Sequence, residues 1–217
     1  MRQRRLRDLD ERMEAFGGRM VSEARELRGR WLDHLSRQAG RPLQELYLEL
    51  GCGKGRFVIT HALEEVDAGF VAVDGQLSVA ILTAESLINA GADNVALIGD
   101  YINDIREYFA AGELDGIYLN FSDPWPKVRH ARRRLTYRDR LARYAEVLKP
   151  GGFVEFKTDN DDFYQFTLKE IEACGFEVQE STTDLHSTGF ESARFTTEYE
   201  EKFSSRGKNI SYVKFTV

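Results

Sequence analysis

The chain has 217 residues, 42% of them hydrophobic, which suits one α/β domain with a sizeable core. Its formal net charge of -6 argues against a protein that coats nucleic acid through its overall charge, although a local basic cluster can still bind an acidic molecule. Two distant cysteines, Cys52 and Cys174, suggest neither a disulfide scaffold nor a zinc site, and no apolar run is long enough to cross a bilayer. We therefore expect a cytoplasmic protein with no bound metal and no membrane contact, either monomeric or homodimeric.

Short apolar runs alternate with longer amphipathic stretches, a pattern typical of a parallel sheet covered by helices. The first 40 residues have a basic start and a mixed-charge helical pattern, and we expect them to extend a single domain spanning 41–217. The predicted elements in chain order are strand 46–50, helix 55–65, strand 69–73, helix 76–89, strand 95–98, helix 102–109, strand 116–119, helix 137–148, a turn at 149–152, strand 152–157 and helix 161–174. Two alternating runs, 177–183 and 211–217, predict antiparallel strands at the sheet edge.

The segment LELGCGKGRF, residues 48–57, places three glycines between the first strand and its helix, at Gly51, Gly53 and Gly55. Such glycines bring the backbone close to a ligand at the carboxyl end of the strand. A phosphate-binding P-loop is excluded because Lys54 is followed by glycine, where Ser or Thr is required. A dinucleotide fingerprint fits poorly because Arg56 stands where its third glycine belongs.

Acidic residues stand at the ends of the first three strands. Glu49 precedes the glycines, where it would repel a pyrophosphate but can take up the positive charge of S-adenosylmethionine. Asp74 can accept both ribose hydroxyls of an adenosine, and Asp100 and Tyr101 stand where we expect the adenine ring. Each acidic residue alone is equally well explained as a helix cap, but their joint placement around one glycine loop favours a cofactor site.

The fourth strand runs into NFSDPWPK, residues 120–127, at the same crevice. Pro124 and Pro126 stiffen this segment and hold Asp123 in place. Trp125 suits either a stacking role against a base or a place in the core, and the sequence leaves both open.

A strongly basic run follows at 127–143, with eight Lys or Arg residues and one Asp. A solvated helix face normally mixes its charges, so this concentration beside the crevice favours phosphate contacts and hence nucleic acid binding. The alternative is a surface helix neutralised by Glu residues from elsewhere in the chain.

Five segments carry a family resemblance: RGRW at 28–31, ELGCGKGRF at 49–57, IYLNFSDPWPKVRHARRRL at 117–135, LKPGGFVEFKTDN at 148–160 and TEYEEKFSSRGKNI at 197–210. The glycine loop by itself indicates only some methyltransferase, whereas the combination with SDPWPK, TDN and TEYEEKF is far more specific. With these motifs the chain resembles bacterial tRNA (guanine-N7-)-methyltransferases from about residue 28 to its end.

The resemblance implies a Rossmann-like α/β methyltransferase sheet of seven strands, mostly parallel with an antiparallel carboxyl-terminal edge and helices on both faces. It implies S-adenosylmethionine as cofactor, bound by Glu49, Gly51, Gly53, Gly55, Asp74, Asp100, Tyr101 and Asp123. It implies tRNA as partner, with guanine 46 of the variable loop as target. The substrate residues it implies are Lys127, Arg129, His130, Arg132, Arg133, Arg134, Asp159, Thr197, Glu198, Tyr199 and Glu200. Family members often carry Glu where this chain has Asp74.

The chemistry expected of such a site is simple. Guanine N7 has an in-plane lone pair and no hydrogen, so methyl transfer needs no general base, and the four histidines form no cluster. Positioning of the two reactants is the main requirement. A carboxylate aimed at the base, Asp123 or Asp159, would accept the N1 and N2 hydrogens of guanine and stabilise the positive charge that develops on it. We assign the catalytic role to Asp123.

Three other functions are less favoured by the sequence. SDPW is similar to the motif of methyltransferases that act on exocyclic amines, although its aromatic residue comes one position early. A non-catalytic RNA-binding module on the same scaffold is disfavoured by the carboxylate at each strand end. A nicotinamide-dependent oxidoreductase is least favoured, because the glycine spacing is wrong and no suitable proton donor is evident.

Overall fold

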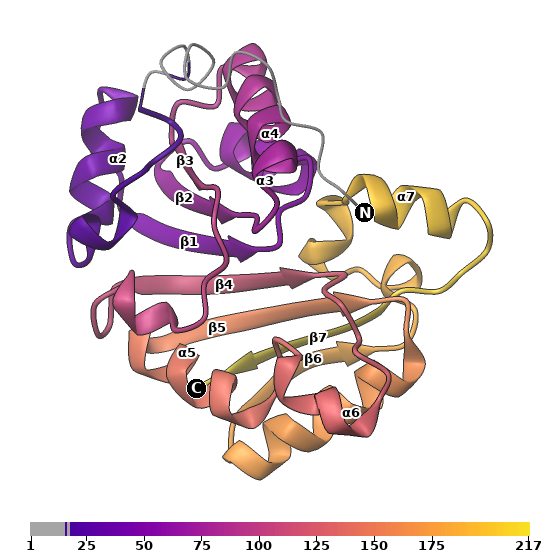
Figure 1. Cartoon of the computed structure of the whole chain (residues 1–217). Helices are drawn as coiled ribbons and strands as arrows, with labels where there is room; N and C mark the ends of the chain where they lie inside the picture. Colours follow the sequence, from indigo (N-terminus) through magenta and orange to yellow (C-terminus); the bar gives the residue numbers. More distant parts are fainter. Residues whose placement is uncertain (1–15, 17) are drawn as a thin grey trace.

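The computed structural model describes residue 16 and residues 18–217, in which seven strands form a sheet of order β3-β2-β1-β4-β5-β7-β6 (Figure 1). The strands are β1 (Glu45–Leu50), β2 (Ala68–Val73), β3 (Val95–Ile98), β4 (Leu114–Asn120), β5 (Leu148–Thr158), β6 (Glu177–Thr182) and β7 (Ser211–Thr216). Strands β1 to β5 run parallel, whereas β7 pairs antiparallel with both β5 and β6. The predicted mostly parallel sheet with an antiparallel carboxyl-terminal edge is confirmed.

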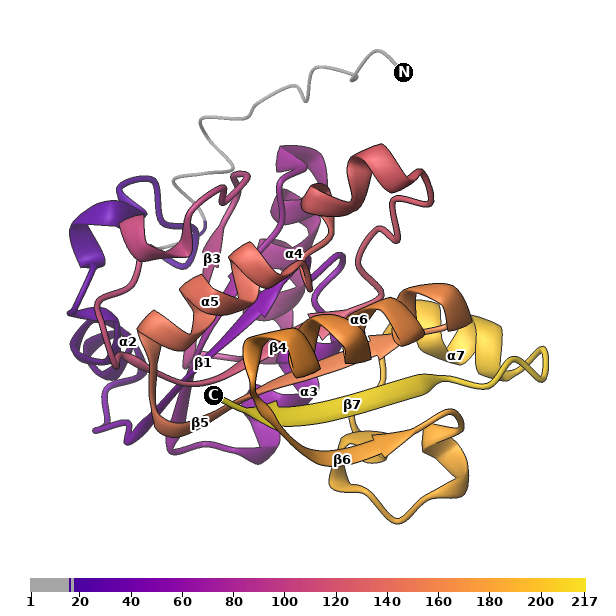
Figure 2. The ribbon, with the colours of Figure 1, turned by 90° about the horizontal axis from the view of Figure 1, so that it is seen from below.

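Helices cover both faces of this sheet, as Figure 2 shows from below. The helices are α2 (Trp31–Ala39), α3 (Arg56–Glu64), α4 (Leu77–Ala90), α5 (Arg138–Val147), α6 (Asp161–Cys174) and α7 (Glu198–Ser204). One apolar core includes Trp31 of α2, Leu141 of α5 and Phe163 of α6, and the core on the opposite face includes Phe57 of α3 and Ile81 of α4. Within the described part of the chain, no helix has the length and apolar character needed to span a membrane.

The helix predicted over 102–109 is wrong, because this segment forms only the short 3-10 helix η2 (Ile105–Glu107). The Asp104 side chain accepts the backbone N–H of Arg106 at 3.1 Å and also binds the guanidinium of that residue. Local side-chain bonds of this kind compete with helical hydrogen bonds. The apolar spacing that suggested a helix still has a physical basis, since Ile105 and Phe109 are both buried.

Two other segments differ from their predicted form. Strand β5 begins at Leu148, so it includes the whole of the turn predicted at 149–152, and its pairing with β4 shifts register between Leu114 and Gly116. The long polar stretch after β6 contains α7 and two short 3-10 helices, η4 (Leu185–Ser187) and η5 (Glu191–Arg194). Two more 3-10 helices are η1 (Ala24–Leu27) and η3 (Val128–Arg133).

The described part of the amino-terminal region packs directly on the domain. Trp31 is fully buried, stacks on Phe109 and donates its indole N–H to the Tyr108 carbonyl at 2.9 Å. Residues 19–21 add backbone hydrogen bonds to the outer edge of β3 at Leu97. The division of the chain at residue 40 stays a prediction, and most of the basic start lies outside the described residues.

Glu113 links the amino-terminal region to the loop before β4 through hydrogen bonds. Its carboxylate accepts the backbone N–H groups of Gly29 at 2.8 Å, Trp31 at 3.1 Å and Ala110 at 2.7 Å. We expect Glu113→Ala to lower the free energy of unfolding by about 1–3 kcal/mol, because partly buried N–H groups lose their acceptor. Urea denaturation measures this change. Glu107→Ala, which removes only an exposed ion pair with Arg25, is the matched control and should cost less than about 1 kcal/mol.

Candidate functional site

Two adjoining cavities lie at the carboxyl ends of the parallel strands. The larger, of about 560 Å³, is lined by the strand ends of β1 to β4 and by the segment that follows β4; we call it the main cavity. The smaller, of about 270 Å³, lies between the glycine loop and the start of α7; we call it the loop cavity. Gly51, Asn120 and Phe121 line both cavities, so the two lie side by side at the end of β4.

The glycine loop is held from β2 and α4. Asp74 accepts the Gly53 N–H at 3.0 Å, and the Thr83 hydroxyl donates to the Gly53 carbonyl at 2.5 Å. Gly55 has φ +83°, and a Cβ there would lie 2.5 Å from the Thr83 methyl carbon. Glycine is therefore required at this position both by backbone conformation and by the approach of α4.

Glu49 is buried at the end of β1 and lines the loop cavity. One carboxylate oxygen accepts the Asn120 side-chain N–H at 2.9 Å, while the other has no hydrogen-bond partner among the described residues. Burial raises the pKa of Glu49 to about 7, against the opposing effects of the Asn120 hydrogen bond and the Lys157 charge. A buried carboxylate beside a cavity is suited to a cationic or hydrogen-donating ligand.

Asp74, Asp100 and Tyr101 all line the main cavity. Burial raises the pKa of Asp74, although the N–H groups of Gln76 and Gly53 that it accepts oppose this shift. Tyr101 is 67% exposed, and a Cβ on Gly75 would overlap its ring. The aromatic side chain therefore lies close over the turn that follows β2.

Asp123 also lines the main cavity, and it forms no hydrogen bond or ion pair with another described residue. The backbone around it is strained, with positive φ at Phe121 (52°) and Trp125 (40°). Arg134 holds the loop by donating to the Pro124 carbonyl at 2.8 Å and the Trp125 carbonyl at 3.2 Å. The Asp123 carboxylate is thus free for a ligand, on a segment that Arg134 holds at the two residues immediately after Asp123.

Trp125 lies at the mouth of the main cavity and is half-buried rather than part of the apolar core. The guanidinium of Arg133 lies 4.9 Å from its ring centroid, and His130 approaches its ring edge. Of the predicted RNA residues, Lys127, Arg129, Arg132 and Arg133 are exposed. Arg134 differs from them, because it packs under the loop with its guanidinium 4.1 Å from the Phe166 ring centroid.

The predicted substrate residues from the end of the chain lie across the loop cavity. Thr197, Glu198 and Tyr199 line it, and the Tyr199 hydroxyl donates to Asp159 at 3.3 Å. Phe121 packs against Tyr199, with ring centroids 5.0 Å apart. Glu200 lines neither cavity and is fully buried.

Sequence reasoning missed Asn120, Thr83 and Lys157 as residues of this region. Asn120 donates a hydrogen bond to Glu49, and Thr83 donates one to the glycine loop. A polar residue at a strand end or inside a helix carries no sequence signal that would reveal such a role. Among the residues that the structure describes, no group of three or more His, Cys, Asp or Glu side chains is arranged to hold a metal ion.

Comparisons with known proteins agree with this geometry. The model of a family described as "Putative methyltransferase" matches residues 43–213. A tRNA (guanine-N(7)-)-methyltransferase of Geobacillus kaustophilus is 38% identical over 92% of this chain and 89% of its own length, and one of Streptococcus uberis is 34% identical over 99% of both.

Solved structures show the same fold at lower sequence identity. An antibiotic-related methyltransferase superposes with a TM-score of 0.60 at 18% identity, covering 84% of this chain and 92% of its own. The 16S rRNA methyltransferase KamB has a TM-score of 0.60 at 15% identity, covering 85% of this chain and 91% of its own. With the curated relatives at 34% and 38% identity over nearly their whole length, the chain belongs to the tRNA (guanine-N(7)-)-methyltransferase family.

Proposed function

We propose that this chain transfers a methyl group from S-adenosylmethionine to N7 of a guanine in tRNA, at position 46 of the variable loop. The observation that carries the proposal is the unpaired Asp123 carboxylate, which stands between the main cavity and the arginine-rich segment. The family relatives supply the name of the reaction, and the site offers the groups that such a reaction needs. We propose a cytoplasmic location because tRNA is found there.

The residues present fit the cofactor. A main cavity of about 560 Å³ is within the usual range for a ligand of this size. Asp74 would accept the ribose hydroxyls, Asp100 and Tyr101 would hold the adenine, and the Glu49 carboxylate beside the loop cavity would attract the positive end of the molecule. Gly51, Gly53 and Gly55 leave room for close approach. When bound, S-adenosylmethionine supplies a methyl group on a positively charged sulfur.

The protein's own contribution is to orient the base and stabilise charge. Guanine N7 carries a free lone pair, so no residue has to remove a proton before transfer. Asp123 accepts N–H groups of the base and faces the positive charge that develops on the purine during transfer. Tyr199, which lines the loop cavity, and Asp159, which accepts the hydrogen bond of its hydroxyl, would contact the same base. Thr197 and Glu198 line the approach beside them.

Exposed cations next to the main cavity supply contacts to the RNA backbone. Lys127, Arg129, Arg132 and Arg133 project from the segment after Asp123, and His130 packs against Trp125 within it. Arg side chains bind phosphate through two parallel hydrogen bonds. Because the target guanine of a folded tRNA is engaged in tertiary contacts, we propose that it is extruded into the site.

The test is to incubate the protein with unmodified tRNA and labelled S-adenosylmethionine. N7-methylguanine makes the RNA sensitive to cleavage by aniline after reduction, which locates the methylated position. Label at N7 of guanine 46 supports the proposal. Label on an exocyclic amine would instead favour the other methyltransferase activity, and the absence of any transfer would favour a non-catalytic RNA-binding protein.

The elevated pKa of Glu49 predicts pH-dependent cofactor binding. With a pKa of about 7 the free carboxyl is mostly protonated at lower pH, whereas a positively charged ligand favours the carboxylate. Binding therefore releases a proton, and cofactor affinity should rise about tenfold between about pH 6 and pH 8 and then level off. Isothermal titration calorimetry in buffers of different ionisation enthalpy measures both quantities. In Glu49→Gln the pH dependence should disappear; an unchanged profile would contradict the assignment.

A further inference from the structure

Lys157 is a buried ammonium next to the site. It lies near the end of β5, opposite Asn120 of β4, and its side chain is 1% exposed. Burying such a charge is costly unless its donors are satisfied and a counter-charge is near. The groups that contact the Lys157 ammonium therefore show which part of the chain this charge holds in place.

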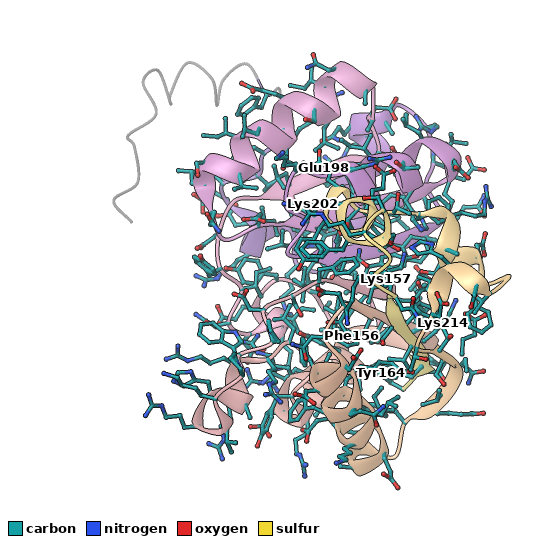
Figure 3. All side chains as sticks on the ribbon, turned by 90° about the vertical axis from the view of Figure 1, so that its right-hand side faces the viewer. Phe156, Lys157, Tyr164, Glu198, Lys202 and Lys214 are labelled. Atoms are coloured by element: carbon teal, nitrogen blue, oxygen red, sulfur yellow. The ribbon has the colours of Figure 1, made fainter. Side chains whose placement is uncertain are left out.

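The hydrogen-bond acceptors of the Lys157 ammonium and its nearest carboxylate come from residues 192–200, which we call the 192–200 segment; the ammonium also lies 5.4 Å from the ring centroid of Phe57. The ammonium donates to the Ser192 carbonyl at 2.6 Å and the Phe195 carbonyl at 2.7 Å, and it lies 3.6 Å from the Glu200 carboxylate. Burial lowers the pKa of Lys157, while the nearby carboxylates of Glu200 and Glu155 oppose this. Figure 3 looks onto the strand ends and shows Lys157 beneath the helix that carries Glu198 and Lys202.

Glu200 connects Lys157 to the start of α7, because it also forms hydrogen bonds with Thr197. One of its carboxylate oxygens accepts the Thr197 N–H at 3.3 Å, while the Thr197 hydroxyl accepts the Glu200 N–H at 2.9 Å. Its other oxygen lies 3.1 Å from the His186 imidazole. With 0% of the residue exposed, Glu200 has no surface to offer to a substrate.

The segments that carry this buried pair also carry Tyr199, which lines the loop cavity, and Asp159, to which Tyr199 is hydrogen-bonded. Asp159 follows Lys157 by two residues, and Tyr199 immediately precedes Glu200. The hydrogen bond between Tyr199 and Asp159 therefore joins α7 to the end of β5, as the buried pair of Lys157 and Glu200 also does. A shift of α7 away from β5 would separate both pairs together.

Other contacts of α7 are weaker anchors. The ion pairs of Lys54 with Glu198, at 3.5 Å, and of Arg56 with Glu201 join the helix to the glycine loop, but all four side chains are more than 40% exposed. Exposed ion pairs contribute little because water and salt screen them. The buried contacts of Lys157 are thus the stronger restraint on the 192–200 segment.

We propose that Lys157 and Glu200 are positioning residues that fix the 192–200 segment against β5, so that Tyr199 and Asp159 form a preshaped pocket for the target base, which neither Lys157 nor Glu200 contacts. This inference rests on the proposed function. It assigns Glu200 an indirect role, acting through Thr197 and the helix start, in place of the substrate contact that the family resemblance implies.

The test uses Lys157→Met and the isosteric Glu200→Gln, singly and combined, in the full chain. Active sites are counted by cofactor titration, and kcat/KM for tRNA is expressed per active site. Each single variant should lose about tenfold or more in kcat/KM for tRNA, with cofactor affinity within about twofold of wild type. Because the two residues act as one unit, the double variant should lose less than the product of the single losses.

The matched control is Lys214→Met, which removes another lysine paired with a glutamate, Glu155, at 3.3 Å on the same sheet. Its kcat/KM should stay at the wild-type value. Losses that vanish once active sites are counted, or single losses that multiply in the double variant, overturn the inference. If Lys157→Met fails to fold, Glu200→Gln decides, since wild-type turnover in that variant also overturns it.

A wild-type protein that does not methylate tRNA refutes the proposed function and this inference with it. An active wild type with unaffected variants refutes the inference alone.

Discussion

Asp123→Ala is expected to lower kcat for tRNA methylation by about 10²–10³-fold, while the protein stays folded and cofactor affinity changes by only a few fold. The reason is the state of the carboxylate: it lines the main cavity, forms no hydrogen bond or ion pair with another described residue, and is held on a segment fixed by Arg134. Its removal costs the fold little but takes away the acceptor for the base and the charge opposite the developing cation.

The measurement is single-turnover methylation of tRNA with saturating enzyme, alongside thermal unfolding and cofactor titration. Asp123→Asn keeps an acceptor for the base without the charge, so its rate should fall between those of wild type and Asp123→Ala. Asp139→Ala removes another exposed carboxylate from the same basic stretch and should leave the rate unchanged. Near-normal turnover in Asp123→Ala would mean that Asp159 or the backbone performs the role.

Elements with a strong hydrophobic pattern were predictable from the sequence. The strand over 95–98 and the helix over 161–174 have the predicted bounds, because apolar spacing and flanking glycines fix where such buried elements end. The segment 102–109 shows the limit of this reasoning, since the apolar spacing is present but the Asp104 side chain replaces helical hydrogen bonds with local ones. Propensity alone does not reveal that competition.

The sequence was enough to group the candidate site residues, but not to tell which of the neighbouring basic side chains are exposed and which are packed. Parallel strands bring Glu49, Asp74, Asp100 and Asp123 to one edge of the sheet, so spacing along the chain was enough to group them. It was not enough to separate neighbours such as Arg133 and Arg134, which differ only in the direction that the short helix η3 and the following turn give their side chains.

Burial is the property that the sequence concealed most completely. Lys157 is the last residue of the predicted strand 152–157, where an exposed lysine is the ordinary expectation. For Glu200 a signal was present, because Thr197-x-x-Glu200 is the pattern of a capping box, which turns the glutamate back toward its own helix start. That pattern predicts a structural use of the residue before any substrate contact is considered.

Replacing Arg129, Arg132 and Arg133 together with Ala is expected to weaken tRNA binding by about 10–100-fold at low salt and to flatten its salt dependence. The three side chains are exposed, and Arg132 and Arg133 line the main cavity. Without them binding neutralises fewer phosphates and releases fewer counterions, so the slope of log affinity against log salt should fall by about 2–3. Arg134 is left in place because it holds the Pro124 and Trp125 carbonyls, and its removal would disturb Asp123 as well.

Filter binding of tRNA over a series of salt concentrations measures this slope, with cofactor affinity recorded in parallel. The matched single variants are Arg132→Ala and Arg37→Ala, which each remove one exposed cation; the second lies on α2, away from the strand ends (Figure 1). Only Arg132→Ala should change the slope. Equal slopes in the triple variant and wild type would mean that η3 is a solvated surface segment, and that the tRNA backbone is bound elsewhere on the protein.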